Sequence, residues 1–345
     1  MRLSFATYRI FLKHPFGISR SSNNWYDIVL LFLQDGNIIG RGEAAPSIRY
    51  NESTEKILSV LKRGINIPES ENMNLEEMQN FIYPQLENIK SLQAAFSMAL
   101  WDWWSQKKNM PLWKILGCEN TKSMETSFTI AIGRIEEIER KIIEADPYNI
   151  LKVKLGTGLK NDKQIIDLIR RETDKVIRVD ANEGWDLDTG IEMSFWLADN
   201  NVEFIEQPFH STNLSDTSKL KNKSPLPIIA DENSINSSDI PKIEDSFDGI
   251  NIKLMKCGSL FEAKKMIEMA RERDMKIMLG CMIESSIAIT AAAHLSPLVD
   301  YADLDGNLLI RNDPYRGVFV DEGKLILPDE NGLGVTLSDN GSGLL

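Results

Sequence analysis

The sequence predicts an α/β protein in which a (β/α) barrel carries an α+β capping domain. Five strand-like segments between residues 150 and 253 each end in, or close to, a Lys, Asp or Glu. These charged residues follow one another at steps of 26, 26, 25 and 22 residues, which is the length of a strand, a loop and a helix. The chain has 345 residues, more than one barrel requires, and this length indicates a second domain.

The capping domain is predicted to span residues 1–118. Asn74 and Glu77 have the spacing of a capping box at the start of a helix. A long stretch with an apolar face follows Ser91 and is expected to stay helical to near Gly117. Strands are expected before these helices, at residues 3–12, 25–34 and 38–43.

The barrel is predicted to span residues 119–318. Its first strand is expected at residues 128–132, its seventh at 276–283 and its last at 301–305. Residues 319–345 contain a further strand-like stretch and then many Gly, Asn and Asp residues. We expect this segment to return to the capping domain.

The charged residues at the strand ends occur in the order Lys154, Asp180, Glu206, Asp231, Lys253. In a barrel the carboxyl ends of the strands form the active-site face. Three carboxylates from adjacent strands would repel one another unless a cation neutralised them, and all-oxygen ligands suit Mg²⁺. The two lysines would then face each other across the metal, an arrangement suited to moving a proton beside a carboxylate. Alternatively, the acids simply cap the helices that follow.

Lys152 and Lys154 alternate along one strand, so their side chains point to the same side. If that side is the barrel interior, two ammonium groups there require anionic partners. The pattern alone also fits a strand whose lysines face outward.

The segments KVKLG, RVDANEGW, EFIEQP, IADEN and NIKLMKCG resemble the motifs of the enolase superfamily, and within it the muconate lactonizing enzyme subgroup. The resemblance implies a modified TIM barrel of the (β/α)7β type below a capping domain. It also implies one Mg²⁺ per subunit. The implied roles are metal ligands for Asp180, Glu206 and Asp231, acid/base catalysts for Lys154 and Lys253, and a partner of the substrate carboxylate for Lys152. Lys256 is interpreted as a loop or surface residue.

Asp303-Leu-Asp305, on the last predicted strand, places two carboxylates on one face. It resembles the Asp-x-Asp of dipeptide epimerases, which implies binding of a free α-ammonium group. The alternative is a turn rich in Asp and Gly. The segment from Cys281 to Ser286 resembles the seventh-strand region of the same enzymes, and Met282 within it is assigned to substrate binding. Thr129 is also assigned to substrate binding.

Two arginines in the predicted capping loops, Arg20 and Arg49, are candidates for binding a second substrate carboxylate. The resemblance therefore implies a magnesium-dependent dipeptide epimerase. Two lysines would perform a 1,1-proton transfer at the α-carbon of the C-terminal residue, through an enediolate, with L-Ala-D/L-Glu as the favoured substrate. The alternatives are o-succinylbenzoate synthase, N-acylamino acid racemase or cycloisomerase activity, and a non-catalytic scaffold.

Composition argues against several classes of partner. The formal net charge of −12 disfavours nucleic acid and anionic membranes, both of which need a basic face. The longest apolar run near the start is too short to span a bilayer. Three widely spaced cysteines suggest reduced thiols, so a cytoplasmic location is expected. The sequence leaves the oligomeric state open, a homo-oligomer included.

Overall fold

The structure is a computed structural model that describes residues 1–345 except 19–20, 70–72, 121–122 and 345. Among the described residues, eight parallel strands form one sheet in chain order, from β4 to β11. The sheet closes on itself where Thr126 bridges Ala302 and the Ser127 amide donates to the Ala302 carbonyl at 3.2 Å. The strands are β4 (Phe128–Ile130), β5 (Ile150–Lys154), β6 (Val176–Asp180), β7 (Val202–Glu206), β8 (Ile228–Ala230), β9 (Gly249–Ile252), β10 (Lys276–Leu279) and β11 (Tyr301–Ala302).

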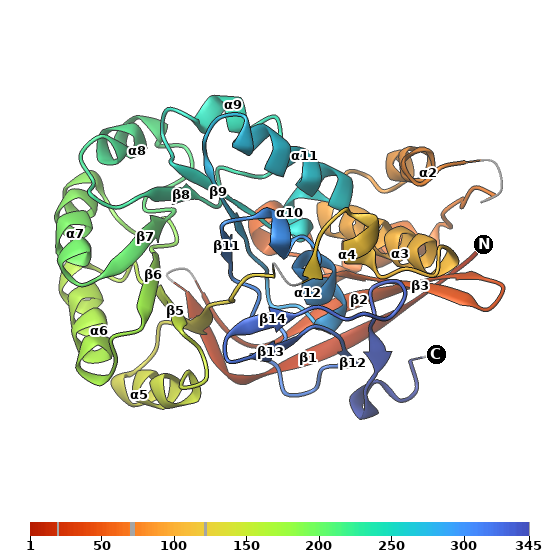
Figure 1. The fold of residues 1–345 in the computed structure, drawn as a ribbon, viewed down its shortest axis with the longest axis horizontal. Coiled ribbons are helices and arrows are strands. Elements are labelled where there is room, and N and C mark those ends of the chain that lie inside the picture. The colour runs from red at the N-terminus through yellow and green to blue at the C-terminus, as the bar shows by residue number, and fades with distance from the viewer. Residues whose placement is uncertain (19–20, 70–72, 121–122, 345) are drawn as a thin grey trace.

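Helices connect successive strands and lie outside the sheet (Figure 1). They are α5 (Ile135–Glu144), α6 (Leu159–Glu172), α7 (Leu187–Asp199), α8 (Leu214–Lys221), α9 (Ile240–Ile243), α10 (Leu254–Cys257), α11 (Leu260–Arg271) and α12 (Ser286–Ala293). After β11 the chain forms no such helix within the described residues. It pairs instead with the capping domain, where the Lys13 amide donates to Leu309 and the Arg311 amide to Phe11, each at 2.9 Å. The predicted (β/α)7β fold class is confirmed.

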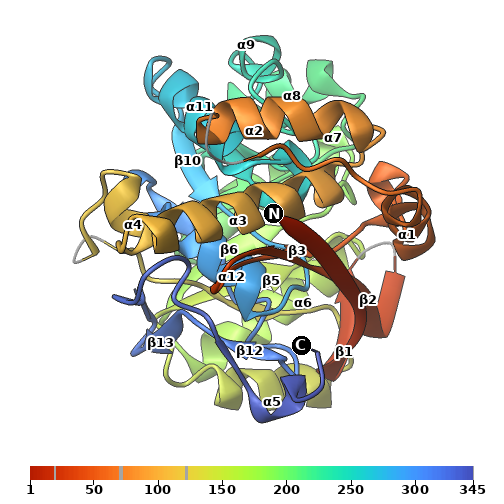
Figure 2. The ribbon, with the colours of Figure 1, turned by 90° about the vertical axis from the view of Figure 1, so that its right-hand side faces the viewer.

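The first part of the chain combines an antiparallel sheet with helices, as Figure 2 shows. Its elements are β1 (Arg2–Ile18), β2 (Ser21–Asp35), β3 (Ile38–Ala44), α1 (Thr54–Lys62), α2 (Leu75–Ile82), α3 (Lys90–Lys107) and α4 (Leu112–Ile115). The capping box of Asn74 and Glu77 at α2 is confirmed. The expectation of one helix reaching near Gly117 was wrong, because Asn109 adopts a positive φ of 51° and Pro111 is the N-cap residue of a separate helix, α4.

Strand β3 lies unusually close to helix α3, and two glycines permit this approach. A Cβ atom on Gly40 would overlap the Ala99 carbonyl oxygen, and one on Gly42 would overlap that of Ala95. Since only glycine lacks this atom, the sequence allows sheet and helix to meet backbone to backbone.

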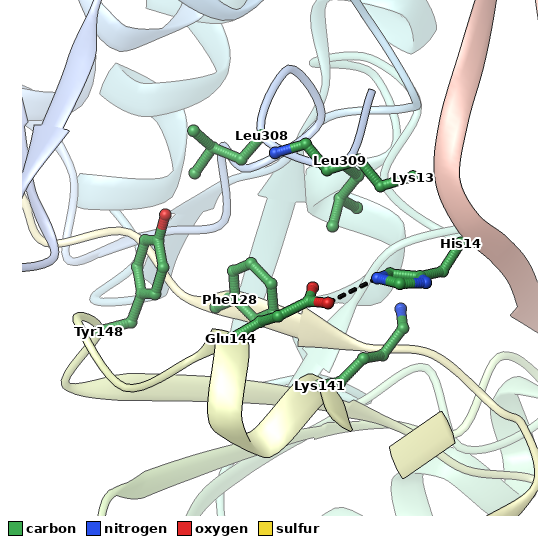
Figure 3. A pocket seen from close by; sticks show the side chains of 8 residues that line it. All are labelled: Lys13, His14, Phe128, Lys141, Glu144, Tyr148, Leu308 and Leu309. Atoms are coloured by element: carbon green, nitrogen blue, oxygen red, sulfur yellow. Dashed lines mark hydrogen bonds and ion pairs between the residues drawn. The ribbon is translucent and has the colours of Figure 1, made fainter. Parts of the chain in front are cut away.

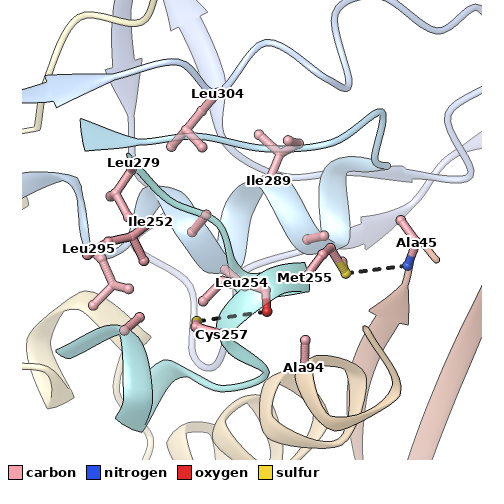
Figure 4. Packing of buried hydrophobic residues seen from close by; sticks show 14 of the residues in the cluster. Ala45, Ala94, Ile252, Leu254, Met255, Cys257, Leu279, Ile289, Leu295 and Leu304 are labelled. Atoms are coloured by element: carbon pink, nitrogen blue, oxygen red, sulfur yellow. Dashed lines mark hydrogen bonds between the residues drawn. The ribbon is translucent and has the colours of Figure 1, made fainter. Parts of the chain in front are cut away.

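The capping domain and the barrel share one apolar core (Figure 4). Helix α10 packs between the barrel strands and α3, and Met255 Sδ lies 3.4 Å from the Ala45 amide nitrogen. A polar contact joins the same two parts, since Glu43 of β3 accepts hydrogen bonds from the Ser285 amide (2.9 Å) and hydroxyl. Glu43 is fully buried, and burial raises its pKa to about 7.

From residue 315 onward the chain forms two small antiparallel strand pairs, one of which begins just before the predicted C-terminal segment. Its strands are β12 (Tyr315–Arg316), β13 (Phe319–Asp321), β14 (Lys324–Ile326) and β15 (Thr336–Leu337). The segment contacts both other parts: the Trp113 indole donates to the Pro328 carbonyl, and His294 Nε2 lies 3.1 Å from the Leu333 carbonyl oxygen. Among the helices that the structure describes, none has the length and apolar character needed to cross a bilayer.

Candidate active site

The charged residues at the ends of neighbouring barrel strands meet because the strands are in register. Lys154 pairs with Asp180 across β5 and β6, and Asp180 pairs with Glu206 across β6 and β7. Asp231 directly follows β8, and Lys253 directly follows β9. The structure therefore brings all five predicted residues to the carboxyl face of the barrel, where a parallel barrel builds its sites.

The three carboxylates form a compact cluster. Asp180, Glu206 and Asp231 are buried, and one oxygen atom from each lies within 4.8 Å of the others. Asn182 fixes Asp180 through its amide (2.8 Å) and side chain (3.1 Å), and Asn251 donates to Glu206 at 2.7 Å. Burial raises the pKa of Glu206, and the neighbouring Asp180 charge adds to this effect. An all-oxygen donor set of three buried carboxylates fits Mg²⁺.

The two predicted catalytic lysines lie on opposite sides of the cluster. Lys154 Nζ lies 2.6 Å from Asp180, and Lys253 Nζ lies 2.8 Å from Asp231. Burial alone would lower the pKa of Lys253, but the Asp231 and Glu206 carboxylates outweigh burial and raise it. This direction is opposite to the one a general base requires. A divalent cation shared by these carboxylates would weaken their hold on the ammonium group and so lower the pKa.

Lys256 is a third lysine of the cluster, and its interpretation as a loop or surface residue was wrong. The side chain is fully buried on α10. Its Nζ donates to the carboxylate (2.5 Å) and the carbonyl oxygen (2.6 Å) of Asp231, and to the Asn251 carbonyl oxygen at 3.0 Å. Helix α10 directly follows Lys253 and packs against α3 of the capping domain, and the contacts of Lys256 with Asp231 and Asn251 place its ammonium group in the cluster.

Lys152 links the cluster to the Asp-x-Asp segment. Its ammonium group lies 2.7 Å from Glu206 and 2.6 Å from Asp303, deep in the barrel. Asp303 also accepts a hydrogen bond from the Ser127 hydroxyl at 2.7 Å. Asp305 accepts one from the Thr129 amide at 2.6 Å. Both predicted lysines of β5 therefore face the interior.

Asp305 differs from Asp303 in its electrostatic balance. It is 3% exposed and, within the described residues, forms no ion pair. Burial and the nearby Asp303 charge raise the pKa of Asp305 to about 6. A cation that enters the site would stabilise the ionised form of this buried carboxylate.

Three substrate-binding candidates remain. Arg49 contacts the barrel, where its Nη2 donates to both oxygens of Glu183 at 2.9 and 3.0 Å. Arg20 lies outside the described residues. Met282 is half-buried, and its amide donates to Glu284 at 2.7 Å. Sequence reasoning assigned no role to Tyr50, which is close enough to Asp231 for that charge, together with burial, to raise the Tyr50 pKa.

Two family matches cover most of the chain. Residues 5–117 match the N-terminal domain of the mandelate racemase and muconate lactonizing enzyme family, and residues 134–341 match the enolase C-terminal domain-like family. The chain belongs to the enolase superfamily. Within this superfamily it is 38% identical to the L-Ala-D/L-Glu epimerase of Bacteroides thetaiotaomicron, over 97% of this chain and 88% of that protein. It is 36% identical to the L-Ala-D/L-amino acid epimerase of Flavobacterium johnsoniae, over 98% and 100% of the two chains.

Solved structures from the superfamily superpose closely on this one. The dipeptide epimerase from Cytophaga hutchinsonii, complexed with Mg and D-Ala-L-Val, gives a TM-score of 0.90 at 26% identity, with 98% of this chain and 95% of that chain covered. The substrate-liganded L-Ala-D/L-Glu epimerase from Bacillus subtilis gives 0.90 at 27% identity, with coverages of 97% and 98%.

Proposed function

We propose that this protein is a magnesium-dependent dipeptide epimerase that inverts the α-carbon of the C-terminal residue. The observation that carries the proposal is the pair Asp303 and Asp305. Asp303 is bound by Lys152, whereas Asp305 is buried and, among the described residues, has only Thr129 as a hydrogen-bond donor. A dipeptide brings an α-ammonium group that would pair with Asp305, and this gain offsets the desolvation of both charges.

The reaction follows from charge placement. Asp180, Glu206 and Asp231 would hold Mg²⁺, and the ion would supply positive charge beside the substrate carboxylate and so make the neighbouring α-proton more acidic. One of Lys154 and Lys253 removes this proton as a neutral amine, and the other returns a proton to the opposite face as an ammonium ion. The negative charge spreads into the carboxylate in between, as an enediolate. Fixed positive groups in a dry site stabilise that charge strongly.

The rival reactions of this fold do not use a free amine. The structure of the N-succinyl Arg/Lys racemase from Bacillus cereus gives a TM-score of 0.91 at 26% identity, so likeness of fold does not separate an N-acyl substrate from a dipeptide. An N-acyl substrate or an o-succinylbenzoate precursor would leave Asp305 without a cation. The names of the two curated relatives also favour dipeptides that begin with L-Ala.

L-Ala-D/L-Glu is the favoured substrate. A second carboxylate on the C-terminal residue needs a cation at the capping side of the site. Since Arg49 is already paired with Glu183, we assign this part to Arg20, with Arg49 as the second choice. Such a dipeptide is a fragment of peptidoglycan, so recycling of that polymer in the cytoplasm is the proposed setting.

The test is deuterium uptake from D₂O in the presence of Mg²⁺, followed by mass spectrometry. L-Ala-L-Glu should gain one mass unit and yield both epimers, whereas N-succinyl-L-Glu should not. Asp305→Asn should reduce kcat/KM for the dipeptide by about 30-fold or more, since loss of one partner of a desolvated charge pair costs about 2–5 kcal/mol. Faster exchange of the N-succinyl compound than of any dipeptide would refute the assignment.

A further inference from the structure

The outer helices of the barrel also carry buried charged side chains, and two of them differ in how their charge is compensated. Lys141 of α5 lines a cavity of about 280 Å³ in the barrel wall, together with His14 and Glu144 (Figure 3). The carboxylates of Asp305 and Glu144 supply opposite charge near this ammonium group. Asp162 of α6 is fully buried as well, but its partners are hydrogen-bond donors from two loops of the active-site face.

Asp162 binds the loop that follows β5. One carboxylate oxygen accepts the Gly156 amide at 3.0 Å, and the other accepts the Thr157 amide at 3.0 Å and the Thr157 hydroxyl at 2.9 Å. The first oxygen also accepts the Trp185 indole N–H at 2.8 Å, from the loop after β6. An ionised carboxylate offers about four lone-pair sites, so these four donors saturate it. The loops therefore stabilise the buried charge, and the charge in turn holds the loops in place.

The loop bound by this carboxylate begins directly after Lys154, the last residue of β5. The Leu155 amide still pairs with the Asp180 carbonyl oxygen at 2.8 Å, and the chain then leaves the sheet at Gly156, whose φ is 97°. A Cβ atom on Gly156 would overlap the Ala181 carbonyl oxygen, so the loop packs backbone to backbone on its neighbour. From Gly156 onward the loop is fixed by the carboxylate on α6 instead of by the sheet.

The lysine on the opposite side of the cluster is held in a different way. Lys253 is the N-cap residue of α10, and its carbonyl oxygen accepts the amides of Lys256 at 2.9 Å and Cys257 at 3.1 Å. A helix therefore fixes the chain that follows Lys253, whereas the Asp162 carboxylate fixes the chain that follows Lys154. Loss of this carboxylate should affect one of the two proposed proton-transfer groups far more than the other.

The loop after β6 has contacts of its own that do not depend on Asp162. Asn182 binds the Asp180 carboxylate through its amide and its side chain. The Trp185 amide donates to the Pro208 carbonyl oxygen at 3.0 Å. The proposed metal ligand on β6 should therefore keep its place when the Trp185 indole loses its acceptor.

We propose that Asp162 is a positioning residue for Lys154. Its contacts with the loop after β5 keep the Lys154 ammonium group aligned with the α-carbon of the dipeptide, so this role rests on the proposed function. Proton transfer requires such alignment, since a displacement of about 1 Å can lower a rate about 100-fold. The role concerns one face of the substrate, and this asymmetry can be measured.

The test follows loss of the α-proton of the glutamate residue from pure L-Ala-L-Glu and from pure L-Ala-D-Glu in D₂O, by proton NMR at early times with saturating Mg²⁺. Exchange of one epimer needs only the lysine on its side, which removes the proton, exchanges its own protons with solvent and returns a deuteron to the same face. Lys154→Ala identifies the epimer that Lys154 serves. Asp162→Asn places an NH₂ group against two of the four donors. It should slow exchange of that epimer by about 10-fold or more and leave the other epimer close to the wild-type rate.

Two further variants and one binding measurement separate positioning from loss of structure. Thr157→Val, at an exposed position, removes only the hydroxyl contact and should change the ratio of the two exchange rates in the same direction by a smaller factor. Asp167→Asn, at an exposed position of the same helix, should leave both rates unchanged. Calorimetric titration of the metal-free protein with Mg²⁺ should give the same affinity for Asp162→Asn as for the wild type.

Equal slowing of both epimers, or slowing only of the epimer that Lys253 serves, would overturn the positioning role and leave the proposed function intact. A marked loss of Mg²⁺ affinity in Asp162→Asn would overturn it too, since Asp162 would then support the whole active-site face. If Asp162→Asn did not fold, an unchanged ratio in Thr157→Val would decide against the role. If the wild-type protein exchanged the α-proton of neither epimer, the proposed function itself would be refuted, and the positioning role with it.

Discussion

The buried contacts of Lys256 lead to a quantitative prediction for the substitution Lys256→Met. Methionine has a similar length but donates no hydrogen bond, so Asp231 loses contacts of 2.5 and 2.6 Å and the Asn251 carbonyl one of 3.0 Å. Breaking a buried ion pair costs about 3–5 kcal/mol. Asp231 keeps Lys253 at 2.8 Å, which favours the lower end of that range.

The assay is thermal unfolding followed by circular dichroism. An unfolding entropy of about 2.1 cal/mol/K per residue corresponds to roughly 0.7 kcal/mol/K for this chain length, so the melting temperature should fall by roughly 4–7 °C. Lys265→Met, an exposed substitution on the neighbouring helix α11, should shift it by less than about 1 °C. If Lys256→Met melted within about 1 °C of the wild type, Lys256 would not be the buried partner of Asp231 that the geometry describes.

Three other predictions concern separate parts of the molecule. Lys253→Ala should abolish epimerisation while one epimer still exchanges its α-proton, and NMR in D₂O that showed normal interconversion would rule out the two-lysine mechanism. Gly42→Ala should destabilise the protein by about 1–3 kcal/mol or more in denaturant unfolding, because the new Cβ overlaps the Ala95 carbonyl, and unchanged stability would contradict that close approach. Burial lowers the pKa of His294 from 6.5 to about 4, so the unfolded chain takes up a proton before the folded protein does as the pH falls. The free energy of unfolding should therefore fall by roughly 3 kcal/mol between pH 6.5 and pH 4. His294→Gln should remove that part of the pH dependence of Tm.

The fold class could be predicted because its signals are local and repeat along the chain. A charged residue after each short apolar strand recurs at nearly constant steps, and parallel register then brings Lys154, Asp180 and Glu206 into one row. The capping box at α2 is equally local, since Asn74 and Glu77 determine it between them. Family and fold are confirmed, and the roles of the individual site residues remain predictions.

Features that depend on distant parts of the chain could not be predicted in this way. Lys256 is buried where helix α3 of the capping domain packs on α10. No sequence pattern near Lys256 predicts that packing. The contact of Arg49 with Glu183 spans 134 residues and depends on how the capping loop meets the barrel.

The contact between Glu43 and Ser285 determines how the active site can exchange substrate with water. Swinging the capping sheet away as a rigid body would break a buried carboxylate's hydrogen bonds and part the apolar core around Met255. Such an opening costs far more than a loop movement, so it would be too rare to admit a dipeptide on each turnover. We therefore expect substrate and product to pass where surface loops move, such as the capping loop whose Arg49 forms an ion pair with Glu183 of the barrel. The rate of product release should depend on the ion pair between Arg49 and Glu183, and it should change little with the stability of the domain interface.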